Sequence, residues 1–143
     1  MEISKYNAEG YIDSTAYEAM TAIMKEERAL RAFRPLVYIC SPYSGDVENH
    51  TAAARRYCRF AVDSGYIPIA PHLLFPQFLD DTVPDERKLG LFFGNVLMSK
   101  CIELWAFGET PSPGMASEID RAKRKNQHIR YFTDDCKEVD ENA

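Results

Sequence analysis

Residues 36–45 read Leu-Val-Tyr-Ile-Cys-Ser-Pro-Tyr-Ser-Gly. The first half is almost wholly apolar, as expected for a short strand that is buried on both faces of a parallel sheet. The second half consists of residues that favour turns and loops. This order of strand and loop recurs further along the chain with helical segments in between, and it predicts that a parallel sheet organises the fold.

The segments downstream alternate between helical and extended patterns. Helices are predicted at 50–64, 85–100 and 115–126, and strands at 66–70, 102–107 and 128–132. Alternation of this kind is typical of a parallel sheet with helices on both faces. We therefore predict an α/β fold: a single-domain, three-layer, doubly wound parallel sheet of four or five strands, flavodoxin-like in general form, with an extra N-terminal helix.

Individual residues suggest where these elements begin and end. Asn49 or Thr51 would cap the helix at 50–64, and Gly65 would end it. Pro68 cannot donate a hydrogen bond to a neighbouring strand, which places its strand near an edge of the sheet. The connection 71–84 is long, and long connections in compact domains often act as lids or binding loops.

Three parts of the chain differ in pattern. Residues 1–34 form an N-terminal extension with an amphipathic helix at 15–33, which either covers the main fold or packs against a second subunit. Residues 35–133 form the α/β domain. Residues 134–143 form an acidic tail that we expect to be disordered.

Composition and charge exclude several classes of function. Apolar residues make up 45% of the chain, as in an ordinary globular protein. The net charge of −5 argues against binding to a nucleic acid polymer, which requires a basic surface. No apolar run is long enough to span a membrane, and the opening residues lack the apolar core of a signal peptide. The cysteines form no close pair, so we expect reduced thiols, a cytoplasmic location and no metal or other cofactor. They are Cys40, Cys58, Cys101 and Cys136.

Two loops that leave the carboxyl ends of predicted strands carry the candidate chemistry, because ligands bind there in such sheets. In the second, 108–114, Gly114 permits a tight turn or a close approach of the backbone to a ligand. The helix that follows offers free N–H groups to a phosphate, and Ser112 adds a hydroxyl. Glu118 lies near this helix start, where the dipole favours the ionised form that suits a nucleophile. The alternative is that Glu118 is an ordinary helix-start residue, with Ser112 or Ser117 as the cap.

The first of these loops, 41–49, offers small residues and one aromatic. Ser41 and Gly45 let the backbone approach a ligand, and Tyr43 supplies an aromatic face and a hydroxyl. His72 follows the second predicted strand, which makes it a further candidate for ligand binding. Turn chemistry explains the loop residues about as well. For His72, a structural hydrogen bond is the more common role of a histidine in such a place.

Residues 37–45 and 112–118, the latter read as S-x-G-x-x-x-E, resemble the nucleoside 2-deoxyribosyltransferase superfamily. The similarity extends over residues 36–132. The superfamily includes the 2′-deoxynucleoside 5′-phosphate N-hydrolases and small phage and bacterial proteins of unassigned role. The resemblance implies that Glu118 attacks C1′ of the sugar and forms a glycosyl-enzyme, and that Ser112 binds a 5′-phosphate.

The resemblance also implies that Ser41, Tyr43 and Gly45 surround the sugar and the base, in a homodimer or higher homo-oligomer. The family has an aspartate near the nucleobase, and this chain departs from that pattern with Gly94 followed by Asn95. Neither side chain can act as an acid. The candidates to replace the aspartate come from or border the long connection, and they are Asp80, Asp81 and Asp85.

Two functions follow from these residues. One is an enzyme, a nucleoside 2-deoxyribosyltransferase or a nucleotide N-glycoside hydrolase, that cleaves or transfers the N-glycosidic bond of a nucleoside or nucleotide. A retaining mechanism of this type uses two carboxyl groups about 5–5.5 Å apart. The other is a non-catalytic module that binds a nucleotide or a nucleoside derivative. Glu118 favours the enzyme, and the absence of an acid at Gly94 and Asn95 favours the binding module.

Overall fold

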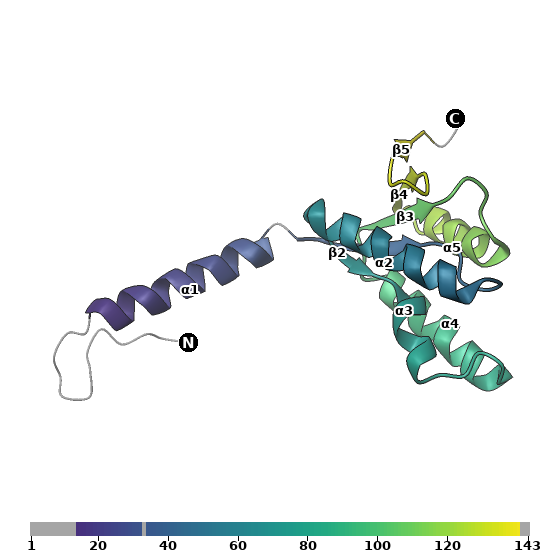
Figure 1. Cartoon of the computed structure of the whole chain (residues 1–143), viewed down its shortest axis with the longest axis horizontal. Helices are drawn as coiled ribbons and strands as arrows, with labels where there is room; N and C mark the ends of the chain where they lie inside the picture. Colours follow the sequence, from purple (N-terminus) through teal and green to yellow (C-terminus); the bar gives the residue numbers. More distant parts are fainter. Residues whose placement is uncertain (1–13, 33, 141–143) are drawn as a thin grey trace. The chain divides into compact units, whose positions relative to one another are not determined.

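The structure is a computed structural model that describes residues 14–32 and 34–140. The chain divides into two units, residues 1–34 and 35–143, whose elements are labelled in Figure 1. None of the described helices is both long and apolar enough to cross a bilayer.

The described part of the first unit is one helix. Helix α1 covers Ser14–Ala32, close to the predicted range of 15–33, of which residue 33 lies outside the described residues. Two of its large apolar side chains, Met20 and Ile23, are exposed.

The second unit contains a five-stranded sheet in the order β2-β1-β3-β4-β5. Strand β1 pairs in parallel with β2 and β3, and β3 pairs in parallel with β4. Strand β5 adds to the edge in the antiparallel sense. The strand bounds are Leu36–Cys40 for β1, Ile67–Ile69 for β2, Glu103–Phe107 for β3, His128–Phe132 for β4 and Glu138–Val139 for β5.

Helices cover both faces of this sheet, which confirms the predicted three-layer fold. Successive strand side chains point to opposite faces, so β1 contributes Val37 and Ile39 to one core and Tyr38 and Cys40 to the other. The first core packs under α2, and the second under α4 and α5. The bounds of these helices are Val47–Asp63 for α2, Pro84–Met98 for α4 and Pro113–Arg124 for α5.

The edge position of the second strand is confirmed, and the predicted cap of α2 is wrong. Pro68 lies in β2 at the end of the sheet, where its missing N–H removes no bond within the sheet interior. Helix α2 starts earlier than predicted, because Asp46 rather than Asn49 or Thr51 caps it by accepting from the Asn49 N–H at 3.3 Å. Gly65 follows the helix end with a φ of +88°, as expected for a helix-ending glycine.

The connection 71–84 is more regular than a loop. It contains the short helix α3, Pro71–Leu74, and the 3₁₀ turn η1, Phe75–Gln77, before it enters α4. Pro71 stands at the first position of α3, where its fixed φ suits a helix and its missing N–H costs no hydrogen bond. The connection is thus built from short helical turns rather than from a structureless lid.

The tail differs from the prediction of disorder over its described residues. Glu138 lies in β5 and accepts from the Arg130 side chain at 2.6 and 3.1 Å. The Arg130 guanidinium lies over the Trp105 ring, 4.8 Å from its centroid, and also faces Glu103 at 3.5 Å. An acid that composition assigns to a solvated tail therefore pairs with a basic residue of the sheet.

Candidate functional site

Three of the predicted site residues lie at one edge of the sheet, just after three different strands. Ser41 directly follows β1, His72 lies in α3 after β2, and Ser112 caps α5 after β3. Because these three strands are parallel, their carboxyl ends meet at the same edge.

Glu118 of α5 and Tyr38 of β1 form a hydrogen-bonded pair under the sheet. The Tyr38 hydroxyl donates to the Glu118 carboxylate, and Tyr38 is almost completely buried, with 5% of its surface exposed. Glu118 is half-buried. The pair therefore gives one carboxyl group a fixed hydrogen-bond donor and shields it partly from water.

Burial raises the pKa of Glu118 to about 7, and the hydrogen bond from Tyr38 acts in the opposite direction. This corrects the expectation that the helix dipole keeps Glu118 ionised. Helix α5 has no acidic residue in its first turn, and Glu118 lies beyond the reach of the dipole's strongest effect. Desolvation then dominates, since it disfavours the charged carboxylate. A carboxyl group with this pKa can exchange a proton near neutral pH.

The Tyr38 hydroxyl lies against α4 at Gly94. A side chain added at Gly94 would place its Cβ 3.6 Å from the Tyr38 oxygen and 3.8 Å from Pro71 carbons. Burial, followed by the charge and hydrogen bond of Glu118, raises the pKa of Tyr38 well above its usual value, so the phenol keeps its proton. The sequence analysis missed Tyr38, because an aromatic residue in an apolar strand is indistinguishable from ordinary core.

The Cys40 thiol lies on the same face of β1 and is fully buried. It points to the Met115 carbonyl of α5 at 3.8 Å, and burial together with the charge of Glu118 raises the pKa of this thiol. Cys40 is therefore a protonated, inert side chain that ties β1 to the start of α5 near Glu118.

Ser41 and His72 form a second polar pair. The Ser41 Oγ lies 3.1 Å from Nε2 of His72, and Ser41 is buried with 5% exposure. Burial, followed by the charge of His50, lowers the pKa of His72 to about 4. His72 is consequently a neutral imidazole at physiological pH, able to donate through one ring nitrogen and accept through the other.

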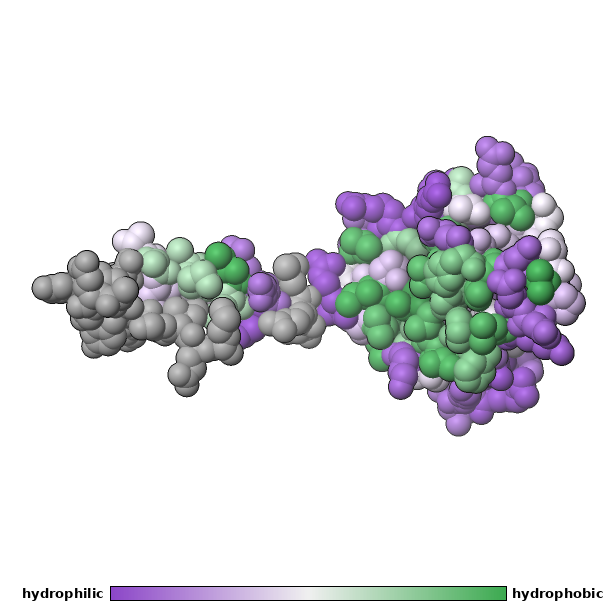
Figure 2. Space-filling view, turned by 90° about the horizontal axis from the view of Figure 1, so that it is seen from below, coloured by the Kyte–Doolittle hydropathy of each residue, from purple (hydrophilic) through white to green (hydrophobic). Residues whose placement is uncertain are grey.

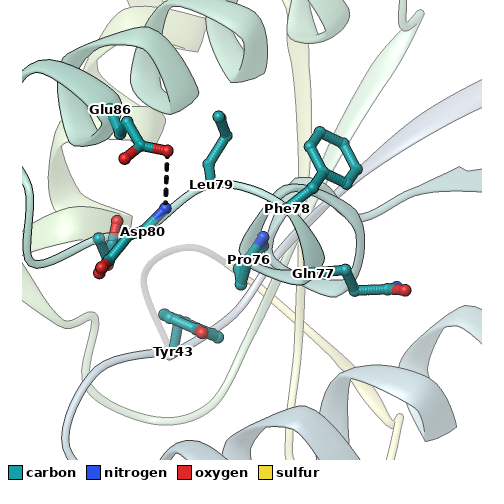
Figure 3. Close-up of a pocket in the computed structure, with 8 residues that line it drawn as sticks. Tyr43, Pro76, Gln77, Phe78, Leu79, Asp80 and Glu86 are labelled. Carbon is teal, nitrogen blue, oxygen red and sulfur yellow. Dashed lines mark hydrogen bonds between the residues drawn. The ribbon is translucent and has the colours of Figure 1, made fainter.

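Tyr43 connects this pair to an open pocket of about 470 Å³. Its ring lies 5.8 Å from the His72 ring, and its carbonyl contacts Nδ1 of His50 at 3.1 Å. Across the pocket from Tyr43, Figure 3 shows η1 and the segment that follows it. The remaining lining residues are Pro76, Gln77, Phe78, Leu79, Asp80, Asp81 and Glu86. Among the predicted binding residues, Tyr43 lines this pocket, and Glu118 does not.

The acids of the pocket stabilise the local backbone. Asp80 accepts from the Thr82 backbone N–H at 2.9 Å and from the Thr82 hydroxyl at 2.6 Å, and these bonds lower the pKa of Asp80. Glu86 accepts from the Asp80 backbone N–H at 3.2 Å, the dashed contact in Figure 3. Asp80 is exposed and holds its proton less well than an ordinary aspartate, so it is not suited to replace the missing acid.

Ser112 and Gly114 lie at the start of α5, as predicted, but Gly114 does not form a tight turn. The Ser112 hydroxyl accepts from the Met115 N–H at 3.3 Å, which is the capping role that the sequence left as an alternative. Gly114 lies within α5 and not in a left-handed turn, and a Cβ there would meet no atom within 4 Å. The open space beside Gly114 leaves the helix start accessible to a ligand.

Three of the other predicted residues lie apart from these contacts. Asn95 is half-buried on α4, and no described contact joins its side chain to the Tyr38 or His72 pairs. Gly45 takes a φ of +91° in the loop before α2, and a Cβ added there would lie 4.0 Å from the His50 ring. Asp85 is exposed in the first turn of α4. Over residues 14–32 and 34–140, no group of three or more histidine, cysteine or acidic side chains is placed to hold a metal ion.

Among solved structures, the fold is similar to that of a 2-deoxyribosyltransferase from the psychrotolerant bacterium Bacillus psychrosaccharolyticus. The TM-score is 0.55 at 15% sequence identity, and the superposition covers 68% of this chain and 72% of that enzyme. At this identity the similarity demonstrates a common fold, and it does not carry the enzyme's activity to this chain.

Sequence comparisons give a family without an assigned activity. No curated protein sequence matches the chain. Residues 35–132 match the sequence model of a family described as a domain of unknown function, DUF7768. This match spans the whole parallel part of the sheet with its three long helices, and the chain is therefore a member of the DUF7768 family.

Proposed function

We propose that this protein cleaves or transfers the N-glycosidic bond of a nucleoside or nucleotide, with Glu118 as the nucleophile. The observation that carries the proposal is the buried Tyr38–Glu118 pair next to the carboxyl edge of the sheet. The fold shared with a 2-deoxyribosyltransferase supports the choice of reaction. The proposed activity is that of a nucleoside 2-deoxyribosyltransferase or a nucleotide N-glycoside hydrolase.

In the proposed reaction, ionised Glu118 attacks C1′ of the sugar. The bond from C1′ to the base nitrogen breaks with both electrons going to the nitrogen, and a bond from C1′ to a Glu118 oxygen forms. A water molecule, or the nitrogen of a second base, then attacks C1′ and releases Glu118. The first outcome is hydrolysis and the second is transfer, and both retain the configuration of the sugar.

Tyr38 acts as a positioning residue in this scheme. Its hydroxyl fixes the Glu118 carboxylate and stabilises the ionised form, which partly offsets the effect of burial on the pKa. With a pKa of about 7, Glu118 is half ionised at neutral pH and fully ionised about two pH units higher. The reaction is therefore expected to be fastest in mildly alkaline solution.

The leaving base receives its proton from water, because Gly94 supplies no acid near Tyr38 and Glu118. Loss of a general acid typically costs about 10²–10⁴-fold in rate. Bases that leave without protonation escape this penalty. The proposed substrates are therefore those whose base is a good leaving group.

Ser41, His72 and Tyr43 bind the sugar and base in the proposal, and the start of α5 at Ser112 and Gly114 binds a 5′-phosphate. Tyr38 lies in β1, which ends at Cys40, and Tyr43 lies in the loop after it. The proposed binding residues Ser41 and Tyr43 therefore lie on the loop that directly follows the strand of the Tyr38–Glu118 pair. The site requires no cofactor, and the proposed assembly is a homodimer or higher homo-oligomer.

The test compares two 2′-deoxynucleosides that differ in leaving group. A purine deoxynucleoside methylated at N7 carries a positive charge on the base and releases it without protonation. We expect its base to be released at least about 10²-fold faster than that of the unmethylated nucleoside, after subtraction of the uncatalysed rate, as measured by chromatography. Glu118→Gln is expected to abolish both, with Asp80→Asn as the matched control. Absence of enzyme-dependent release from either substrate would refute the catalytic proposal.

One observation favours the second candidate, a module that binds a nucleotide or nucleoside derivative without reaction. Gly94 leaves Glu118 without a second carboxyl group, and the neutral forms of Glu118 and His72 dominate between their pKa values of about 7 and about 4. Calorimetry with deoxynucleoside monophosphates that showed binding without base release would select this alternative.

A further inference from the structure

The pocket beside Tyr43 has an acidic lining. Among the described residues that line it, Asp80, Asp81 and Glu86 are acids, and none is a lysine, an arginine or a histidine. One oxygen of Asp80 accepts both hydrogen bonds from Thr82, and one oxygen of Glu86 accepts from the Asp80 backbone N–H. Asp81 and the second oxygen of Glu86 are left to contact a ligand. A pocket whose charged groups are all of one sign attracts a ligand of the opposite sign.

The walls of the pocket suit a flat ring. Figure 3 shows Tyr43 on one side, with Phe78 and Leu79 on the other. Phe78 is 62% exposed, and Figure 2 shows hydrophobic surface gathered on the unit 35–143 around this region. The faces of aromatic rings bind organic cations. Over the described residues, no group of three or more histidine, cysteine or acidic side chains could hold a metal ion. The pocket therefore fits an organic cation with a planar ring.

Helix α4 connects this pocket to the Tyr38–Glu118 pair. Gly90 and Gly94 lie one turn apart on α4, about 6 Å along its axis. A Cβ at Gly90 would lie 3.6 Å from Leu79, which lines the pocket, and a Cβ at Gly94 would lie 3.6 Å from the Tyr38 hydroxyl. The pocket wall and the pair therefore rest against successive turns of one face of this helix.

The surroundings of Glu118 also favour a cationic base. The described residue of α4 that faces Tyr38 is Gly94, which has no carboxyl group to protonate a leaving base. A base with a positive charge needs no proton, because the electrons of its bond to C1′ neutralise it as it leaves. The ionised carboxylate of Glu118 bonds to C1′ in the same step, so one positive and one negative charge disappear together. Partial burial favours such a step, since it disfavours charged groups.

We propose that the substrates are cationic N-glycosides, in which the base is a planar ring that carries a positive charge, and that the pocket holds this ring. Tyr43 and Phe78 contact its faces, and Asp81 and Glu86 balance its charge. This inference rests on the proposed function and names the substrate class of that reaction. The charge attraction is present in the bound substrate and is lost as the base becomes neutral. Asp81 and Glu86 therefore act on KM rather than on kcat.

The first experiment measures binding without reaction, in the full chain with Glu118→Gln. The probes are 2′-deoxyribosyl pyridinium and its phenyl C-nucleoside, in which a carbon atom replaces the ring nitrogen and removes the charge. Calorimetry is expected to show at least about tenfold tighter binding of the pyridinium probe. This preference should shrink as salt rises from about 0.05 M to about 0.5 M, because salt screens exposed charges.

Variants in the same background separate charge from ring contact. Asp81→Asn with Glu86→Gln should reduce the preference to less than about threefold, and Asp85→Asn is the matched control, because Asp85 is exposed beside Glu86 but does not line the pocket. Phe78→Ala should weaken both probes about tenfold. Phe92→Ala should weaken neither, since Phe92 is 61% exposed but lies outside the pocket lining. Circular dichroism checks that each variant folds.

The second experiment measures release of pyridine from the pyridinium probe by the chain with its native Glu118. The double variant Asp81→Asn, Glu86→Gln should raise KM about tenfold and change kcat by less than about threefold. Equal affinity for the two probes, a preference that survives the double variant, or an unchanged KM would overturn the inference, even where bases are released from other nucleosides. The expected preference without release of a base from any nucleoside would instead overturn the proposed function, and the pocket would remain a site for cationic rings.

Discussion

Glu118 and Asp80 are carboxylic acids in opposite surroundings. Glu118 is half-buried next to Tyr38, and burial raises its pKa to about 7. Asp80 is exposed at the rim of the pocket, and two hydrogen bonds from Thr82 lower its pKa. The pocket thus contains an acid, Asp80, whose pKa is shifted away from neutral pH. Strongly shifted pKa values are common at functional sites, and exclusion of water produces such a shift at Glu118 and not at Asp80, which supports the proposal for the Tyr38–Glu118 pair.

The largest expected effect separates these two carboxyl groups by activity. Glu118→Gln removes the proposed nucleophile and should lower base release by roughly 10³-fold or more. Asp80→Asn keeps a hydrogen-bond acceptor for Thr82 and should change the rate by less than about threefold. Chromatographic assay of released base measures both variants. Equal losses in the two would remove the distinction between the pair and the pocket.

The second prediction concerns the pH dependence of the rate. If ionised Glu118 is the nucleophile, kcat/KM should rise about tenfold per pH unit below 7 and level off above it. Tyr38→Phe removes a hydrogen bond that favours the carboxylate, so the midpoint should move upward by about one pH unit. A midpoint that is unchanged in Tyr38→Phe, or that follows Asp80→Asn instead, would contradict the assignment.

The third prediction concerns the pH dependence of the free energy of unfolding, to which Glu118 and His72 are each expected to contribute on the order of 2 kcal/mol. The folded pKa of Glu118 is raised, so its contribution is complete at low pH and is lost as the pH rises toward 7. The folded pKa of His72 is lowered to about 4, so its contribution is complete above pH 6.5 and is lost as the pH falls. The two slopes oppose each other between pH 4.5 and 6.5.

Urea unfolding at pH 5 and pH 6.5 tests this cancellation. Wild type should change little between the two values. Glu118→Gln should become more stable as the pH rises, and His72→Gln should become less stable. Asp80→Asn should follow the wild type over this range, because the lowered pKa of Asp80 acts at more acid pH. Identical slopes in all variants would show that neither buried group titrates as described.

The smallest expected effect is on stability and concerns two glycines of α4. Gly94 lies beside the Tyr38–Glu118 pair, and Gly90 lies beside Leu79, which lines the pocket. A Cβ at Gly94 would approach the Tyr38 hydroxyl at 3.6 Å, and a Cβ at Gly90 would approach Leu79 at 3.6 Å. Both are ordinary contact distances, so Gly94→Ala and Gly90→Ala should each stabilise the helix by about 0.5–1 kcal/mol. Thermal unfolding measures this. Destabilisation in Gly94→Ala alone would show that the Tyr38 pair requires more room than the pocket side of the helix.

Most of the fold can be predicted from the sequence, because short sequence patterns identify its strands and helices. The apolar run at 36–40 and the proline at 68 identify a buried strand and an edge strand without knowledge of any contact. The tail strand was not accessible, because it depends on Arg130 reaching Glu138 from a neighbouring strand. The α2 cap was missed by one turn, since several capping residues stand close together between 46 and 51.

The sequence predicts the positions of the site residues, but it does not predict their pKa values. Ser41 and His72 are far apart in sequence, yet their positions after parallel strands correctly predict one common edge. The state of Glu118 was predicted wrongly, because burial depends on the packing of α5 against β1, and the sequence shows only the helix start. The sequence does not identify Tyr38 either, because its role depends on the hydrogen bond to Glu118, which forms only in the folded chain.

The pKa values of Glu118 and His72 are in the reverse of their usual order, because that of the carboxyl group, about 7, is above that of the imidazole, about 4. Between these two pKa values, about 4 for His72 and about 7 for Glu118, the protonated carboxyl group and the neutral ring dominate, and most copies of the site carry no charge on either group. Above pH 7 the site gains a single negative charge. A ligand that carries a phosphate should therefore bind more weakly as the solution turns alkaline, whereas an uncharged nucleoside should be indifferent to the change. Acidity would then select between the two classes of ligand without any movement of the chain.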